Sequence, residues 1–309
     1  MSALPSVDCV IVTHNTREMT LRCVESVLAA EDGGPAIACT VVDNASSDGT
    51  AEAIRERFPG VRVLRNERNA GYAAACNQGL RGGSGGLVLI LNSDIVARPG
   101  AIARLAGFLA ESPEHVAAGG RLVDPGTDDV QVGHNVRAFP RLGPQLAQML
   151  GLERRRPRNP LSRRYLMLDM DYGRTQDVDQ PAGSCLICRR AGFDAVGGFD
   201  EGYFYWYEDV DLVRRLRDRG RVAYVHDAVF EHVGGATFAQ WGRPDQILSW
   251  YPSLFRYFGR HRPLRERIAL RAAAAVLCAL RAAAYAPFDR ARAGACLRVV
   301  RLALGLRRP

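Results

Sequence analysis

The sequence predicts an α/β protein with a mixed, mainly parallel sheet, helices on both sheet faces and a helical C-terminal tail. Three observations lead to this prediction. β-Branched runs alternate with amphipathic segments over residues 7–91, as they do in consecutive βα units. Polar residues follow directly after these runs, where an open parallel sheet binds its ligands. Beyond residue 257 the chain is dominated by arginine, alanine and leucine, which favour helix.

The expected elements alternate from the beginning of the chain. β-Branched residues mark the strands, and apolar residues three or four apart mark the helices. A further helix is expected to begin near Glu208, and a strand is expected to precede His232. The early strands are expected at residues 7–13, 36–42, 61–65 and 87–91, with helices between them at 17–30, 49–58 and 70–80.

Between Arg121 and Gln180 the pattern becomes irregular, and it includes a basic run at residues 154–158. Long irregular insertions often form lids or binding loops, so ligand recognition is one interpretation of this segment. A solvated, partly disordered loop is the other interpretation.

Length and composition are those of an ordinary globular protein. A chain of 309 residues with 47% apolar and 24% charged residues can form one large or two modest domains. The net charge of +8 comes from arginine alone, since the sequence contains no lysine, and twelve arginines fall within residues 260–309. No base-reading module accompanies this basic tail, so we expect no nucleic-acid partner.

The eight cysteines are scattered along the chain. Cys185 and Cys188 form a Cys-x-x-Cys pair within an apolar run that is expected to be a strand, where an odd spacing puts them on opposite faces. We therefore expect reduced, mostly buried thiols, as in a cytoplasmic protein, in preference to a metal or redox site.

Neither secretion nor a membrane span is expected. The chain has no charged-then-apolar leader, and its longest unbroken apolar run, residues 272–280, is too short to cross a bilayer. Within the tail, Ile268, Ala272, Val276 and Ala279 lie on one apolar helical stripe with arginines around it. Such a helix can lie on an anionic membrane surface or dock on the preceding domain, and the sequence leaves both interpretations open.

The strongest candidate for a catalytic group lies in an aromatic and acidic segment, residues 198–212. If a helix begins near Glu208, Asp209 lies on its inward side and Asp211 points outward toward Arg215. The free N–H groups and the dipole of the first helical turn keep an inward carboxylate ionised, which suits a base or a cation ligand. An N-cap with solvated ion pairs is the alternative interpretation.

Two common nucleotide-binding motifs are absent. The turn after the first strand reads Thr-His-Asn-Thr in place of Gly-x-Gly-x-x-Gly, and a chain without lysine has no Gly-Lys-Ser or Gly-Lys-Thr run. Hydride transfer from a dinucleotide and ATP hydrolysis on a P-loop are therefore disfavoured.

Several short segments, taken in order from about Val7 to Gly235, resemble family 2 glycosyltransferases of the GT-A fold, most of all the rhamnosyltransferase type. Each segment is weak alone, but their common order and their position at the ligand-binding edge of the sheet are specific. They read Val-Ile-Val-Thr-His-Asn at 10–15, Val-Val-Asp-Asn-Ala-Ser-Ser-Asp-Gly-Thr at 41–50, Asn-Ala-Gly-Tyr-Ala-Ala-Ala-Cys-Asn-Gln-Gly at 69–79, Leu-Asn-Ser-Asp at 91–94, Gly-Gly-Phe-Asp-Glu at 197–201 and Tyr-Glu-Asp-Val-Asp-Leu at 207–212.

This resemblance implies a nucleotide site along the carboxyl edge of the sheet. Asp43 matches an aspartate that accepts a hydrogen bond from the pyrimidine imide N–H, with an Asx-turn or N-cap as the alternative. Gly71 either borders the nucleotide or serves only a close approach of the backbone. The residues implied for nucleotide binding are Thr13, Asn15, Asp43, Asn44, Asn69, Gly71, Asn77, Asn92 and Ser93.

The resemblance also implies a divalent cation, Mg²⁺ or Mn²⁺. Asn92-Ser93-Asp94 occupies the place of the family's Asp-x-Asp motif, and only Asp94 is acidic here. One carboxylate is compatible with Mg²⁺, which uses one or two carboxylates together with phosphate oxygens and water. His232 matches a histidine that can complete the metal shell. The alternatives are a turn residue for Asp94 and a hydrogen-bonded surface histidine for His232.

Asp209 matches the general base of the family, and Glu208 is its neighbour in the motif. The resemblance thus implies an inverting transferase that moves one sugar, with rhamnose from dTDP-rhamnose as the leading donor, to a hydroxyl of a glycan or lipid-linked acceptor in cell-surface polysaccharide synthesis. A nucleotidyltransferase and a non-catalytic sugar-nucleotide-binding or membrane adaptor remain as alternatives.

The expected organisation is a nucleotide-sugar transferase domain at residues 1–240 and a basic amphipathic helical extension at 241–309. A nucleotide-sugar donor and a basic tail are consistent with a location in the cytoplasm, either free or on the inner face of the cell membrane.

Overall fold

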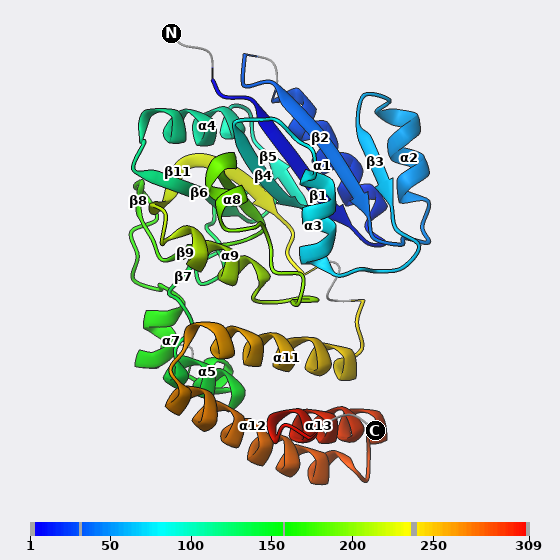
Figure 1. Ribbon diagram of the computed structural model, residues 1–309, viewed down its shortest axis with the longest axis vertical. Coiled ribbons are helices and arrows are strands. Elements are labelled where there is room, and N and C mark those ends of the chain that lie inside the picture. The colour runs from blue at the N-terminus through cyan, green and yellow to red at the C-terminus, as the bar shows by residue number, and fades with distance from the viewer. Residues whose placement is uncertain (1–3, 31–32, 157, 236–239, 307–309) are drawn as a thin grey trace.

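The computed structural model describes residues 4–30, 33–156, 158–235 and 240–306. It consists of a mixed sheet with helices on both faces and a stack of helices at its C-terminal end (Figure 1). The predicted fold class is therefore confirmed. The strands and helices expected within residues 7–91 are present, with ends that differ by one or two residues.

The central sheet has the strand order β3-β2-β1-β4-β10-β6-β11-β5, with β8 paired to β11. β1 pairs in parallel with β2 and β4, whereas β10 runs antiparallel between β4 and β6. The registers place Thr13 opposite Asp43 and Val12 opposite Asn92, so three polar loops begin side by side at one edge. The strands are β1 Val7–Thr13, β2 Ile37–Asp43, β3 Arg62–Arg65, β4 Leu87–Asn92, β5 Ile95–Ala97, β6 His115–Val123, β10 Cys185–Arg189 and β11 Arg221–His232.

Alternate side chains of the buried strands face two separate cores, as the period of two in a strand requires. Cys9 and Ile11 face one core, and Val10 and Val12 face the other. Helices cover both faces, which is why the central strands are apolar along their whole length. The first face is covered by α1 Arg17–Ala29, α2 Thr50–Arg57 and α4 Ala101–Glu111, and the second by α3 Tyr72–Leu80, α8 Arg190–Ala195 and α9 Glu208–Leu216.

The irregular segment between Arg121 and Gln180 contains several short elements. Asn159 caps one of the short helices by accepting a hydrogen bond from the Ser162 backbone N–H at 3.0 Å. The interpretation of this segment as a partly disordered loop therefore does not describe its helical part; Pro157 lies outside the described residues. The elements are β7 Val136–Arg137, α5 Leu142–Met149, α6 Leu152–Arg155, α7 Pro160–Tyr165, β8 Gln176–Asp177 and β9 Gln180–Pro181.

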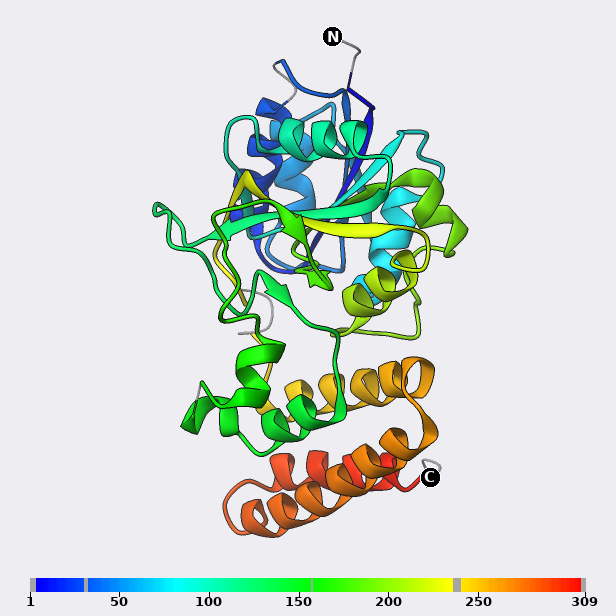
Figure 2. The same ribbon diagram turned by 90° about the vertical axis from the view of Figure 1, so that its left-hand side faces the viewer.

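Three C-terminal helices form a layer beneath the sheet domain: α11 Arg243–His261, α12 Leu264–Tyr285 and α13 Arg290–Ala303. In both views α11 lies between the sheet domain and the α12–α13 pair (Figures 1 and 2). A third core joins these helices to the N-terminal end of α9, where Tyr207 and Val210 pack with residues of α11 such as Leu254.

The α12 helix docks on its neighbours, but through a different stripe from the one expected. Leu270, Ala274 and Cys278 are fully buried. Ile268 and Val276, which lie on the stripe identified in the sequence, are 59% and 60% exposed. By length and composition α12 could also cross a membrane, because its most apolar stretch of 18 residues has a mean hydropathy of 1.6. Only 22% of this stretch is buried inside the protein. The unbroken apolar run in this helix, residues 272–280, is shorter than that stretch because Arg271 and Arg281 flank it.

All eight cysteines are free and buried, as predicted. Cys185 and Cys188 lie in the two different cores on opposite faces of the sheet. Burial raises the pKa of each of these two thiols to about 12, so neither is a thiolate at neutral pH.

Candidate active site

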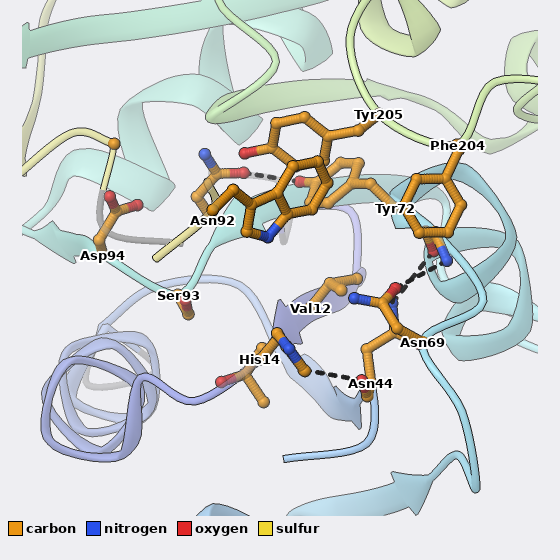
Figure 3. Close-up of a pocket in the computed structure, with 14 residues that line it drawn as sticks. Val12, His14, Asn44, Asn69, Tyr72, Asn92, Ser93, Asp94, Phe204 and Tyr205 are labelled. Carbon is orange, nitrogen blue, oxygen red and sulfur yellow. Dashed lines mark hydrogen bonds between the residues drawn. The ribbon is translucent and has the colours of Figure 1, made fainter. Parts of the chain in front are cut away.

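A narrow pocket lies at the carboxyl ends of β1, β2 and β4 (Figure 3). Its volume is about 60 Å³. The rings of Phe204 and Trp241, with centroids 6.1 Å apart, and the ring of Tyr205 cover it. The lining residues are Val12, Thr13, His14, Asn44, Asn69, Gly71, Tyr72, Asn92, Ser93, Asp94, Phe204, Tyr205, Gly235 and Trp241.

Asp43 ends β2 and is 1% exposed, and it does not itself line this pocket, although the next residue, Asn44, does. Its Oδ1 accepts a hydrogen bond from the Ser46 N–H at 2.8 Å, which is an Asx-turn. Its Oδ2 is buried and has no hydrogen-bond partner within the described part of the chain. A buried carboxylate oxygen without a donor is costly, and an imide N–H is a donor that could satisfy it. The turn role and the nucleotide role are therefore compatible.

Asn44 is the centre of a hydrogen-bond network that fixes the pocket floor. Its Nδ2 donates to Asn69 Oδ1 at 2.8 Å, and its Oδ1 accepts from the Ala70 N–H at 2.9 Å and from Asn66 Nδ2 at 3.0 Å. The His14 ring nitrogen Nδ1 lies 2.9 Å from the Asn44 carbonyl oxygen. The side chain of Asn44 thus shapes the loops and has little capacity left to bind a ligand directly.

Gly71 is required by the backbone around it. It has φ of +87°, and a Cβ at this position would lie 2.8 Å from the Phe204 carbonyl oxygen. The following N–H, that of Tyr72, donates to this same carbonyl at 2.9 Å. The close approach ties the loop before α3 to the aromatic cover of the pocket.

Three other residues expected at the nucleotide site have their side chains engaged elsewhere. Thr13 Oγ1 lies 2.8 Å from Thr20 Oγ1 in a buried hydroxyl cluster, so only its backbone can face the pocket. Asn15 Oδ1 accepts from the Ser47 N–H and links two loops. Asn77 exchanges hydrogen bonds with the backbone of Phe199. Asn15 and Asn77 do not line the pocket.

Asn92 and Ser93 both line the pocket, and their polar groups have protein partners. Asn92 Oδ1 accepts from the Tyr72 hydroxyl at 2.8 Å (Figure 3). Ser93 Oγ lies 2.9 Å from Thr16 Oγ1. These contacts hold the β4–β5 turn, which carries Asp94, in a fixed position.

Asp94 and His232 lie together at the edge of this pocket, with Asp94 Oδ1 3.6 Å from His232 Nε2. Gln131 Nε2 donates to Asp124 Oδ1 and to the His232 carbonyl, which leaves Gln131 Oε1 as the acceptor that lies 2.7 Å from His232 Nδ1. His232 therefore carries its proton on Nδ1 and directs the lone pair of Nε2 toward the carboxylate. Burial lowers the pKa of His232, against the opposing effect of Asp94.

The lone pair of His232 Nε2 faces an oxygen of Asp94, and a cation between these two atoms would stabilise the arrangement. The imidazole nitrogen and the carboxylate oxygen are therefore suitable ligands for a divalent ion. Within the described residues, no group of three or more His, Cys, Asp or Glu side chains could hold a metal. A cation at Asp94 and His232 would therefore need further oxygen ligands from a substrate or from water, as Mg²⁺ commonly does.

A second, much larger cavity of about 1000 Å³ adjoins the pocket and shares Tyr72, Asn92, Tyr205 and Gly235 with it. It extends from the N-terminal end of α9 to the C-terminal helices. Asp209 lines this cavity, and its Oδ2 accepts from the Gly183 N–H at 3.0 Å and from Gln180 Nε2 at 3.2 Å. These two donors orient the carboxylate and leave Oδ1 for a ligand.

The Glu208–Asp209 pair is strongly perturbed. Burial, and then the charge of Asp209, raise the pKa of Glu208 to about 8. Burial also raises the pKa of Asp209, opposed by N–H donors and by the Arg137 guanidinium. Glu208 is therefore mainly protonated at neutral pH, and Asp209 is the carboxylate that can accept a proton from a bound hydroxyl.

Asp211 forms the expected ion pair with Arg215, but the expectation that it points outward is wrong. It is 0% exposed and accepts from Arg215 Nε at 2.7 Å, and His261 Nε2 lies 2.7 Å from its other oxygen. Its pKa is lowered by these partners, His261 first among them, against the effect of burial. The α11 helix covers this side of α9, so Asp211 joins the two helices.

Several functional candidates were not identified from the sequence. Gly183 and Gln180, which orient Asp209, and Gln131, which fixes the His232 tautomer, come from the irregular segment or its end. No local periodicity marks them, because each acts only through a contact that is distant in the chain. Tyr72 follows Gly71, which was a candidate from the sequence. The hydrogen bond from the Tyr72 hydroxyl to Asn92, which brings Tyr72 to the pocket, could not be predicted from the sequence.

The fold, together with a pocket at the carboxyl edge of the sheet, is that of a glycosyltransferase-type domain. A family model described as Glycosyl transferase family 2 matches residues 8–187. The chain belongs to this family.

An N-acetylglucosaminyl-diphospho-decaprenol L-rhamnosyltransferase of Mycobacterium tuberculosis is 34% identical over 209 residues, which are 63% of this chain and 66% of that protein, slightly less than two thirds of its length.

Two solved structures show the same GT-A fold at low sequence identity. GalNAc-T7 with UDP, GalNAc and Mn²⁺ superposes with a TM-score of 0.58 at 18% identity, covering 82% of this chain and 48% of that one. The mannosyltransferase PcManGT of Pyrobaculum calidifontis, in complex with GDP-Man and Mn²⁺, has a TM-score of 0.53 at 18% identity, covering 99% and 87%.

Proposed function

We propose that this protein is an inverting, cation-assisted glycosyltransferase that moves one sugar from a nucleoside diphosphate to an acceptor hydroxyl. The narrow pocket binds the nucleotide, with Asp43 Oδ2 accepting from the base. The large cavity binds the acceptor. The observation that carries the proposal is the position of Asp209. Asp209 lines the large cavity, and this cavity shares a wall with the narrow pocket.

In the proposed reaction, Asp209 Oδ1 takes the proton of the acceptor hydroxyl while that oxygen bonds to the anomeric carbon. The bond from this carbon to the diphosphate oxygen breaks, and the nucleoside diphosphate leaves with the electron pair. One base is sufficient because the leaving group is a good one, and attack from the opposite side inverts the anomeric centre. Burial raises the pKa of Asp209 toward the working pH, which strengthens it as a base.

Asp94 and His232 are the residues that would hold the divalent cation. Their fixed positions and the neutral state of His232 support this role. When bound, a cation neutralises charge that develops on the departing diphosphate. The relatives in complex with Mn²⁺ have the same fold, which makes Mn²⁺ and Mg²⁺ the ions to test.

The test of the base is Asp209→Asn, with Asp218→Asn as a matched control, because Asp218 is exposed just beyond α9. Loss of a general base lowers kcat by about 10²- to 10⁴-fold, while nucleotide affinity should be retained. Turnover by Asp209→Asn at the wild-type rate would refute the mechanism. Cation-dependent release of nucleoside diphosphate that is unchanged in this variant would favour a binding or adaptor role.

We propose dTDP-rhamnose as the donor and a lipid-linked saccharide as the acceptor. The support is the 34% identity to a rhamnosyltransferase whose name specifies a diphospho-decaprenol acceptor. A panel of nucleotide sugars should identify the donor by thermal stabilisation, measured with and without Mg²⁺ or Mn²⁺. Absence of a response to every pyrimidine nucleotide would contradict the nucleotide assignment.

We further propose that residues 1–240 form the transferase unit and 241–309 a membrane-docking extension that places the enzyme at the inner face of the cell membrane. The extension has fourteen arginines and three acidic residues. The α12 helix exposes Ile268, Val276 and Leu280, the last being 64% exposed. Apolar side chains among arginines suit an anionic bilayer surface.

Vesicle cosedimentation tests this location. The double variant Ile268→Asp with Val276→Asp should lose binding to phosphatidylglycerol vesicles, whereas Val132→Asp, a change at a 48% exposed site in the sheet domain, should retain it. Equal binding to neutral phosphatidylcholine vesicles, or no effect of the double variant, would contradict the proposal.

A further inference from the structure

Four arginines and three acidic residues, Glu153, Glu208 and Asp209, line the large cavity, and Glu208 is mainly protonated at neutral pH. Arg137, Arg243, Arg281 and Arg292 line it. Of these four, only Arg292 has a carboxylate within 4.0 Å among the described residues, with Asp289 Oδ2 at 3.2 Å from its Nε. Ionic side chains in folded proteins are usually paired where they are partly buried. This cavity therefore offers an anion several unneutralised donors.

Arg281 is the most constrained of these cations. Its Nη1 donates to the Tyr251 hydroxyl at 3.2 Å, and its Nη2 donates to the Met149 carbonyl. Both partners are neutral, so they hold the guanidinium in place without cancelling its charge. A guanidinium has five N–H donors, and these two contacts leave three of them for a ligand in the cavity.

Arg281 and Arg292 line the same cavity although they belong to different helices. Tyr285 is four residues after Arg281 on α12, so the two side chains share a face one turn apart. The Arg292 guanidinium lies 5.0 Å from the Tyr285 ring centroid. The ends of α12 and α13 thus place two guanidinium groups on one wall of the cavity.

A path of aromatic rings joins the candidate base to these arginines. Tyr207 precedes the Glu208–Asp209 pair, and its ring centroid lies 6.4 Å from that of Trp250. Trp250 contacts Tyr251 at 4.9 Å, and the Tyr251 hydroxyl accepts from Arg281. Tyr207, Trp250 and Tyr251 all line the cavity, and aromatic rings provide the flat apolar surface on which the C–H face of a sugar ring can pack.

We propose that Arg281 and Arg292 bind a diphosphate group of the acceptor, while the sugar that bears the reacting hydroxyl lies on the aromatic wall near Asp209. Two guanidinium forks that line one cavity match a group with several anionic oxygens better than a single carboxylate. The assignment of the acceptor end rests on the proposed function. This diphosphate is separate from that of the donor, which the Asp94–His232 end of the site would hold.

A structural role for Arg281 is the competing explanation, because its bond to Met149 fastens α12 to the end of α5. Arg271 is the matched control. It is also a half-buried residue of α12, it donates to the Leu302 carbonyl at 2.9 Å and it stacks over Phe255 at 4.9 Å. Arg271 does not line the cavity.

The first experiment measures binding without catalysis. Geranyl diphosphate is titrated into the full chain by calorimetry in EDTA, so that no cation can bridge it to Asp94. We expect Arg281→Met and Arg292→Met each to weaken binding about tenfold, the value of one lost charge-assisted hydrogen bond, and Arg271→Met to leave it unchanged. Equal weakening by all three variants, no weakening by any, or wild-type binding no tighter than that of geraniol would overturn the proposal.

The second experiment compares one acceptor sugar as a lipid diphosphate and as a neutral alkyl glycoside. The described contacts of Arg292 include no hydrogen bond or ion pair with α5. In Arg292→Met, KM should therefore rise only for the diphosphate acceptor, and donor KM should not change. A rise for both acceptors would overturn the proposal. If no nucleotide sugar is transferred at all while the calorimetric pattern holds, the proposed function fails and the anion site stands.

Discussion

Replacing Gly183 by alanine is expected to inactivate the enzyme while leaving it folded. Gly183 is not in the left-handed region of φ, so its backbone accepts any residue. The constraint is spatial, because an added Cβ would lie 2.4 Å from Asp209 Cβ and 2.7 Å from Asp209 Oδ2. The substituted methyl group would therefore act directly on the proposed base.

The expected magnitude follows from this distance. Ordinary contact begins at 3.4 Å, so the carboxylate and the loop must separate by about 1 Å, and a misplacement of that size costs about 10²-fold in rate. Displacement also stretches the 3.0 Å hydrogen bond from the Gly183 N–H that orients Oδ2. The nucleotide pocket does not include Gly183, so donor affinity should remain.

The assay is kcat for sugar transfer, with donor affinity from thermal shift and folding from Tm. Gly60→Ala is the control, since a Cβ there meets nothing within 4 Å and Gly60 is not in the left-handed region. If Gly183→Ala turns over at the wild-type rate with unchanged Tm, the Gly183–Asp209 contact does not belong to the working geometry, and the argument for Asp209 as the oriented base fails.

Three further predictions concern the charges around α9. Glu208→Gln should increase Tm more at pH 8 than at pH 5. The pKa of the buried Glu208 carboxyl is raised from 4.5 to about 8, so the wild type loses stability as the pH rises between these values. The glutamine variant does not titrate and keeps its stability. An equal gain at both pH values would contradict this. Asp211→Asn should lower the free energy of unfolding by about 3 kcal/mol, because it leaves His261 and Arg215 without their buried partner; an unchanged denaturant midpoint would contradict it. Arg137→Met should shift the acidic limb of the pH–rate profile to higher pH, because the guanidinium lowers the pKa of Asp209; an unmoved limb would place Arg137 outside the reacting site.

The sheet and the edge at which its polar turns meet could be predicted because they depend on local patterns. Buried parallel strands such as Val7–Thr13 are apolar along their length, and the turns that follow them are polar. In-register pairing then brings the ends of β1, β2 and β4 together. Asp43, Asp94 and Asp209 were candidates for the same reason, since each stands at the end of a strand or the beginning of a helix.

The roles of individual side chains at this edge could not be predicted in the same way. Asn44 and Asn77 stand in the expected segments, yet their amides bond to other loops. An amide can bind a ligand or a neighbouring loop equally well, and its sequence position does not say which partner is within reach. That choice depends on contacts with chain segments that are far away in sequence.

The sequence by itself determined the α/β fold, the buried cysteines and the carboxylates at the sheet edge, because β-branched runs, turn residues and helix starts act over a few neighbouring positions. Only the tertiary structure decided that Asp211 is buried, that α12 docks through Leu270, Ala274 and Cys278, and that Arg281 and Arg292 line one cavity. The α12 helix is apolar around much of its circumference, so periodicity could not select the docking face. Helices distant in the chain made that selection by the surfaces that they brought against it.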